Sequence, residues 1–82
     1  MPVREMRFTE TCISEIQKHV EFEGEILEML REAMNHPETF PFDLFGRRKA
    51  EHSNPGLTLY FWINDADGSI IFDAFRGPKT IS

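Results

Sequence analysis

Residues 57–76 carry more apolar surface than a single layer of helices can cover. They read Leu-Thr-Leu-Tyr-Phe-Trp-Ile-Asn-Asp-Ala-Asp-Gly-Ser-Ile-Ile-Phe-Asp-Ala-Phe-Arg, a pattern that predicts a β-hairpin. Successive side chains of a strand point to opposite faces, so Leu59 and Phe61 fall on one face and Tyr60 and Trp62 on the other. Both faces are therefore largely apolar, and the second one needs a cover, either from within the chain or from a partner.

The turn chemistry of Asp65–Gly68 predicts the register of this hairpin. A type I turn with Gly68 in the left-handed position of a bulge sets Asp65 opposite Ser69. On the face expected to meet a helix this register pairs Ile63 with Ile71, Phe61 with Asp73, and Leu59 with Phe75. On the other face it pairs Trp62 with Phe72, Tyr60 with Ala74, and Thr58 with Arg76. The carboxylate of Asp73 is then discordant, and it must reach a sheet edge, a basic side chain or water.

Residues 11–36 are predicted to be helical, as one amphipathic helix or as a broken helix pair. Ser14 begins a capping-box pattern, and a threonine at position 9 or 11 offers an earlier cap. Gly24 favours a break near residues 22–24, because glycine costs about 1 kcal/mol relative to alanine in a helix interior. The helix is expected to end at residues 35–37. The apolar stripe of this segment is predicted to consist of Ile13, Ile16, Val20, Leu27, Leu30 and Met34.

The remaining segments are assigned from shorter patterns. Residues 1–8 include a candidate short strand, residues 37–56 are predicted to be an aromatic and then basic loop, and residues 77–82 a tail. Because loops rarely expose several phenylalanines, Phe40, Phe42 and Phe45 are expected to pack on the sheet and to be the internal candidate for covering Tyr60 and Trp62. The basic part, residues 46–56, is expected to be exposed.

Together these elements predict one α+β domain over residues 1–82, with the helical segment packed on a small antiparallel sheet dominated by the C-terminal hairpin. Cys12 is the only cysteine, so no internal disulfide can form, and the N-terminus lacks the pattern of a signal peptide. No apolar run approaches the roughly 20 residues that cross a bilayer. We therefore expect a soluble protein of the reducing cytoplasm with no membrane partner.

Charge is distributed unevenly along the chain. Residues 1–45 hold four basic and ten acidic side chains, whereas residues 46–82 hold five basic and four acidic ones. The acidic excess falls on the predicted helix. Because nucleic-acid binding depends on neutralising phosphates, this excess disfavours a nucleic-acid partner and favours solubility or docking to a basic protein surface.

No residue set in the sequence indicates a metal, a cofactor or a catalytic group. Residues 64–68 resemble a calcium loop, but Ile63 stands where its first carboxylate ligand belongs. The possible soft ligands lack paired close spacing: Cys12, His19, His36 and His52. Cys12 also has glutamate-rich surroundings, which oppose a thiolate, so a buried or idle thiol is expected.

An enzymatic alternative comes from the basic side chains of the second half. Residues Arg47, Arg48, Lys49, Arg76 and Lys79, with Tyr60 and His52, would converge on the exposed sheet face and handle RNA phosphates without metal. A strand, helices and then strands ending in arginine resembles, in the order of elements only, the small RelE-like ribonuclease toxins of bacterial toxin–antitoxin pairs. That resemblance implies a metal-independent ribonuclease, although such toxins are strongly basic and this chain is acidic.

The function expected first is that of a non-enzymatic protein-binding module, an inhibitor or regulator such as a phage anti-defence or immunity protein. Its partner would be a protein with a basic or apolar surface, and self-association of the aromatic face into a homodimer is an alternative. The expected partner-binding residues are aromatic anchors and acidic residues that steer a basic partner: Tyr60, Trp62, Phe72, Phe42 and Phe45, and Glu21, Glu25, Glu28 and Glu32.

Overall fold

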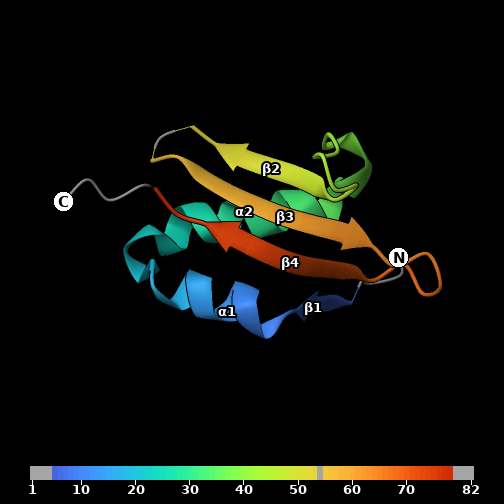
Figure 1. Cartoon of the computed structure of the whole chain (residues 1–82), viewed down its shortest axis with the longest axis horizontal. Helices are drawn as coiled ribbons and strands as arrows, with labels where there is room; N and C mark the ends of the chain where they lie inside the picture. The colour runs from blue at the N-terminus through green and yellow to red at the C-terminus, as the bar shows by residue number, and fades with distance from the viewer. Residues whose placement is uncertain (1–4, 54, 79–82) are drawn as a thin grey trace.

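Two α-helices pack on one face of a four-stranded sheet, which confirms the predicted α+β class (Figure 1). The computed structural model describes residues 5–53 and 55–78. The elements follow one another as β1 (Met6–Phe8), α1 (Glu10–Gln17), the 3-10 helix η1 (Val20–Phe22), α2 (Glu23–Asn35), the 3-10 helix η2 (Pro37–Thr39), β2 (Arg48–His52), β3 (Leu57–Ile63) and β4 (Ile70–Arg76).

The sheet is mixed, whereas the sequence predicted an antiparallel one. Its strand order is β1-β4-β3-β2, and β1 runs parallel to β4, with Phe8 beside Phe72. The parallel pair is possible because α1 follows β1 at once and starts the long connection that parallel strands require. The candidate strand at the N-terminus is thus confirmed for residues 6–8, while residues 1–4 lie outside the described part of the chain.

The hairpin of β3 and β4 forms as predicted, but its register holds only in the half far from the turn. Tyr60 pairs with Ala74 as expected, and then the register shifts, so that Phe61 pairs with Phe72 and Trp62 with Ile71. The irregularity leaves Asp73 as the extra residue between two pairs, as in a β-bulge. The pairs predicted for Phe61, Trp62 and Ile63 were therefore wrong. Phe72 lies in the core opposite Phe61, and Asp73 lies on the other face of the sheet.

The helical segment is a pair, broken one turn earlier than Gly24 suggested. Thr9 caps α1 by accepting a hydrogen bond from the Cys12 backbone amide at 3.1 Å. The chain then turns through η1, and Gly24 lies in the first turn of α2, where its amide has no intrahelical acceptor to lose. The predicted end at residues 35–37 is confirmed. No helix in the described ranges is long and apolar enough to pass through a bilayer.

The break changes which helical side chains face the sheet. The buried ones are Cys12, Ile26, Met29 and Ala33, whereas Val20, Leu27 and Ile13 of the predicted stripe are exposed. The other members of the predicted stripe, Ile16, Leu30 and Met34, pack against the core. The stripe is not continuous, because the turn at residues 18–22 separates α1 from α2. The core lies between these helices and one face of the sheet, where the largest fully buried side chains are Phe61, Phe72, Leu57, Leu59 and Ile70.

The segment predicted to be an exposed basic loop contains strand β2. Arg48–His52 pairs antiparallel with β3, and Ala50 is buried against the helical layer. This strand was not predictable from the sequence. The residues around Ala50 are charged, so the apolar–polar alternation typical of a half-buried strand is weak. Of the predicted tail, residues 79–82 lie outside the described part of the chain.

Candidate functional site: the open sheet face

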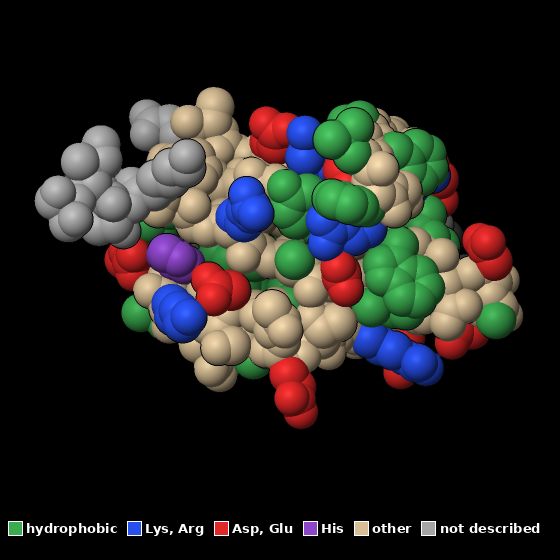
Figure 2. Space-filling model, in the orientation of Figure 1, with side chains coloured by type: hydrophobic (Ala, Val, Ile, Leu, Met, Phe, Trp, Pro, Cys, Tyr) green, Lys and Arg blue, Asp and Glu red, His purple; other side chains and the backbone are tan. Residues whose placement is uncertain are grey.

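Among the residues that the structure describes, no helix covers the face of the sheet turned away from α1 and α2 (Figure 1). We call it the open face; its side chains come from alternate positions of the three long strands, and the 43–47 loop borders it. In Figure 2, hydrophobic side chains gather over one half of this face and alternate there with basic ones. The strand residues of the open face are Lys49, Glu51, Thr58, Tyr60, Trp62, Ile71, Asp73, Ala74 and Arg76.

Arg47 joins the loop to the sheet through two carboxylates. Its Nη1 donates to Asp73 Oδ2 at 2.7 Å, and its Nε donates to Asp43 Oδ2 at 3.1 Å. The guanidinium carbon also lies 4.3 Å from the centroid of the Tyr60 ring, within the range of a cation–π contact. Asp73, the discordant residue of the sequence, therefore finds the basic partner that a partly buried carboxylate requires.

The 43–47 loop is closed by hydrogen bonds to Asp43. Its Oδ1 accepts from the backbone amides of Phe45 at 3.0 Å and of Arg47 at 2.7 Å, and the Asp43 amide donates to the Arg47 carbonyl at 2.6 Å. Gly46 has φ of 81°, a left-handed conformation that favours glycine. The loop is thus held in one shape, and that shape places Leu44 and Phe45 at its tip, 99% and 82% exposed.

The charges of this cluster stabilise one another. Partial desolvation alone would raise the pKa of Asp43, but the hydrogen bonds from the Arg47 backbone and side chain and from the Phe45 amide together hold that pKa below its usual value. The hydrogen bond with Asp73, followed by those with Asp43, keeps the pKa of Arg47 above its usual value. Both groups are ionised at neutral pH, so the loop stays attached to the sheet there.

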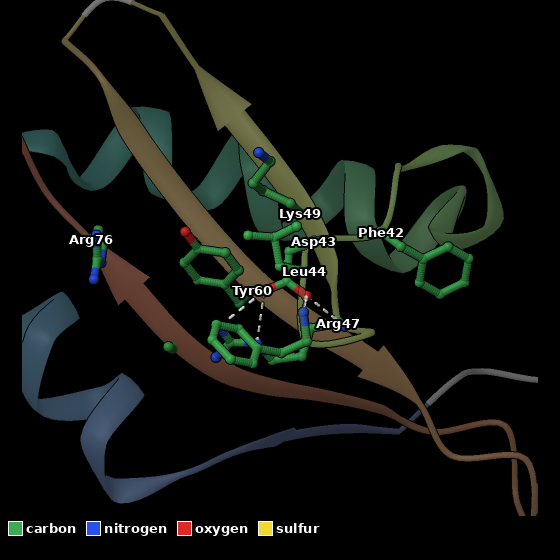
Figure 3. A pocket seen from close by; sticks show the side chains of 9 residues that line it. Phe42, Asp43, Leu44, Arg47, Lys49, Tyr60 and Arg76 are labelled. Atoms are coloured by element: carbon green, nitrogen blue, oxygen red, sulfur yellow. Dashed lines mark hydrogen bonds and ion pairs between the residues drawn. The ribbon is translucent and has the colours of Figure 1, made fainter.

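A pocket of about 510 Å³ opens between the loop and the strands (Figure 3). Its apolar lining includes Leu44, Phe45 and Ala74, and its polar lining includes Lys49 and Arg76. In Figure 3 the Tyr60 hydroxyl points toward the side of the pocket where Arg76 and Lys49 lie. This volume is within the range of about 300–1,000 Å³ that small-molecule and peptide-side-chain sites occupy.

Four of the five aromatic anchors expected from the sequence lie on or beside the open face. Trp62 is 42% exposed, Phe42 and Phe45 are exposed, and Tyr60 is half-buried beneath Arg47. Phe72 was wrong as a surface anchor: it is fully buried, because the bulge at Asp73 turns it toward the helices.

The phenylalanines of the aromatic loop do not seal the open face. Phe40 packs edge-on against Phe61, at 5.5 Å between ring centroids, and belongs to the border of the core. Phe42 packs under the guanidinium of Arg48, with Arg48 Cζ 4.3 Å from the centroid of its ring. The expectation that this segment covers Tyr60 and Trp62 holds only for Tyr60, which borders the pocket beside Phe42 and Phe45, while Trp62 stays exposed.

The expected acidic residues lie in the helical layer, away from the open face. Glu25, Glu28 and Glu32 follow one another on α2 at helical spacing, and Glu21 lies in η1, with Oε1 3.7 Å from His19 Nδ1. Glu28 and Glu32 are exposed and border a shallow hollow next to β2. The aromatic and the acidic candidate residues therefore belong to two different surfaces.

The basic set expected for RNA handling is brought together only in part. Arg47, Lys49, Tyr60 and Arg76 line one pocket. Arg48 instead donates to the Phe40 carbonyl at 2.9 Å, and His52 borders the hollow beside α2. Lys79 lies outside the described residues.

The candidate metal ligands and the lone thiol are scattered. Within residues 5–53 and 55–78 no three His, Cys, Asp or Glu side chains form a group suited to a metal ion. Cys12 is fully buried, as expected, and burial, with a smaller contribution from Asp73, raises its pKa to about 11. The ring of His19 packs against Phe22 and Phe75.

Leu44 and the pairing of Asp43 with Arg47 were missed in the sequence. A signal existed: Asp43 precedes Gly46 by three residues and Arg47 by four, which is typical of a turn closed by an aspartate side chain. The position of Asp73 opposite Arg47 had no signal, because it depends on a bulge in β4.

Comparisons of the chain with protein-family models, with curated proteins and with solved structures give no match. The function is therefore inferred from the residues and geometry of the chain.

Proposed function

We propose that this chain is a non-enzymatic protein-binding module, an inhibitor or regulator, that docks its partner on the open face. The observation that carries the proposal is the tip of the 43–47 loop, where Leu44 and Phe45 are held in water by a loop that its own hydrogen bonds close. A rigid loop that exposes two large apolar side chains costs solvation energy in the free chain and loses little entropy on binding.

Trp62 and Tyr60 extend this docking surface along β3. Tryptophan, tyrosine and arginine are the residues most often found where binding energy concentrates, and Trp62, Tyr60 and Arg47 lie on the same face. The burial of Leu44, Phe45 and Trp62 by a partner would contribute several kcal/mol, at about 25 cal/mol per Å² of apolar area.

The acidic residues of α2 are assigned a secondary role. Glu28 and Glu32 face outward from the helical layer, so they do not touch a partner seated flat on the open face. Their charge can still speed the approach of a basic partner, since such fields extend for about one Debye length, roughly 8 Å at physiological salt.

A capture experiment tests the proposal. The wild-type chain and a Leu44→Ser/Phe45→Ser variant are immobilised and exposed to lysate of the source organism, and the captured proteins are compared. We expect a defined partner to be captured by the wild type and lost with the variant. The matched control is Val20→Ser/Leu27→Ser, which removes two exposed apolar side chains from the helical layer and should leave capture intact.

Sedimentation of the same variants separates a partner from self-association. A chain that binds another protein sediments near 9.6 kDa over a wide concentration range. A mass that doubles with concentration, and that the Leu44→Ser/Phe45→Ser variant restores to 9.6 kDa, would replace the proposal with a homodimer built on the open face. Equal capture by the wild type and this variant would show that the open face is not the docking surface.

A further inference from the structure

The pocket beside the 43–47 loop combines apolar walls with a cation whose side chain pairs with no other residue of the described part of the chain. Arg76 is exposed at the end of β4, where it pairs with Thr58 in the sheet, and its side chain makes no hydrogen bond or ion pair with any other described residue. The other two cations of the lining are engaged: Arg47 binds Asp43 and Asp73, and Lys49 Nζ lies 2.9 Å from Glu51 Oε1. The pocket therefore offers one guanidinium that is unpaired among the described residues, in a lining that also includes Leu44 and Ala74.

We infer that this pocket binds an acidic segment of the partner protein, with a carboxylate on Arg76 and a neighbouring large apolar side chain against Leu44, Phe45 and Tyr60. This inference rests on the proposed function and names the chemistry of its partner. An exposed guanidinium takes a carboxylate through two parallel hydrogen bonds, which fixes direction as well as charge.

The charge pattern favours an acidic peptide over a nucleic acid. Nucleic-acid binding draws its affinity from several phosphates neutralised together, and Arg76 is the single cation of the pocket lining without a carboxylate neighbour among the described residues. A ligand with one carboxylate and neighbouring apolar side chains therefore complements a pocket with one unpaired guanidinium and apolar walls.

The loop also indicates that the carboxylate comes from a side chain and not from a chain terminus. Terminal carboxylates are commonly captured by several backbone amides that converge on them. Here the amides of Asp43, Phe45, Gly46 and Arg47 all donate to acceptors within the loop. Within the loop only the Leu44 amide has no internal acceptor, and one amide cannot form such a converging group. The side-chain donors that line the pocket include those of Arg76, Lys49 and Tyr60.

A matched pair of peptides tests this inference. The probes are the acetylated and amidated pentapeptides Leu-Glu-Phe-Glu-Leu and Leu-Gln-Phe-Gln-Leu, which differ in charge and little in shape. Each is titrated into the isotope-labelled full chain and followed by two-dimensional NMR. We expect the acidic peptide to shift the amides of Lys49, Tyr60, Ala74 and Arg76, and to bind about tenfold more tightly than its neutral counterpart.

Three variants assign the binding to its groups. Arg76→Gln should remove the preference for the acidic peptide, whereas Arg31→Gln, which removes an exposed cation from α2, should preserve it. Leu44→Ser should weaken the binding of both peptides. Each variant is first checked for an unchanged spectrum away from its own site.

Several outcomes overturn the inference. Equal affinity for the two peptides means that the pocket selects apolar groups without regard to charge, in which case partner capture through Leu44 and Phe45 still stands. Shifts of the pocket amides by neither peptide, or a preference that survives Arg76→Gln, also reject it. Tighter, Arg76-dependent binding of a hexauridylate would reject both the acidic partner and the proposed non-enzymatic function in favour of RNA.

Discussion

At the scale of single residues, aromatic side chains ten positions apart in one hairpin have opposite roles. Phe72 is fully buried opposite Phe61, with their ring centroids 5.9 Å apart, while Trp62 lies on the open face and is 42% exposed. The difference follows from the bulge at Asp73, which moves Phe72 to the helical side.

We expect Phe72→Ala to lower the free energy of unfolding by about 3–5 kcal/mol, because it leaves a cavity in the core. Trp62→Ala should cost about 1 kcal/mol or less, since the indole is only partly removed from water. Urea unfolding followed by circular dichroism measures both. A Trp62→Ala chain that no longer folds would show that the open face belongs to the core.

The buried thiol of Cys12 gives a second prediction. Burial and the nearby Asp73 raise its pKa to about 11, so at pH 8 the folded chain holds almost no thiolate. Ellman's reagent at pH 8 should label the native chain at the slow rate of unfolding and the urea-unfolded chain within minutes. Equal labelling rates in the two states would contradict the buried position.

At the scale of elements, the end of β4 depends on a contact with the turn between the two helices. The His19 ring packs over Gly77, and a Cβ built on Gly77 would overlap the ring atoms Cε1 and Nε2. The ring has little room to move, because it also packs against Phe22 and Phe75.

We therefore expect Gly77→Ala to destabilise the chain by about 1–3 kcal/mol, the range found when a side chain is forced into a packed site. Thermal unfolding of Gly77→Ala measures the effect. The double variant Gly77→Ala/His19→Ala should recover part of the loss, since the overlapping ring is gone. No recovery in the double variant would show that the cost comes from the backbone and not from the ring.

The sequence predicted most of the elements but only part of the surface. The helical segment, its end at Pro37 and the hairpin were predictable because their signals are local: apolar spacing, a proline and a turn glycine. Strand β2 and the pairing of β1 with β4 were not, because they depend on which distant strand offers a free edge.

The same distinction applies to the candidate site. Tyr60, Trp62 and Phe45 were predictable as surface aromatics from alternation and loop composition. The position of Arg47 between Asp43 and Asp73 was not, because residues 47 and 73 meet only through the sheet and its bulge. A bulge changes the face of every residue on one side of it, and neither strand has a glycine there to reveal it.

At the scale of the whole molecule, the stability of the fold depends on the ionisation of two aspartates at separate turns. Asp67 accepts from the Ser69 hydroxyl at 2.6 Å and from the Ser69 amide at 2.9 Å, and these bonds hold its pKa below the usual value. The pKa of Asp43 is likewise lowered, by the hydrogen-bond donors of its own loop.

This pair predicts how stability varies with pH. A pKa lowered by folding stabilises the native state only while the carboxyl is ionised, so the contribution is complete above the ordinary value of 3.8 and is lost as the pH falls below it. The urea midpoint should therefore fall from pH 4 downward, and Asp43→Asn/Asp67→Asn should flatten that fall. An identical acid profile for the double variant would assign acid sensitivity to other carboxyls.

The exposure of Trp62 has a consequence for observing the molecule. It is the only tryptophan of the sequence, and it lies on the open face. Indole emission moves to shorter wavelengths when water leaves its surroundings, so this natural fluorophore stands where a partner would displace water. If a partner docks on the open face as proposed, the emission of the unlabelled chain reports its binding.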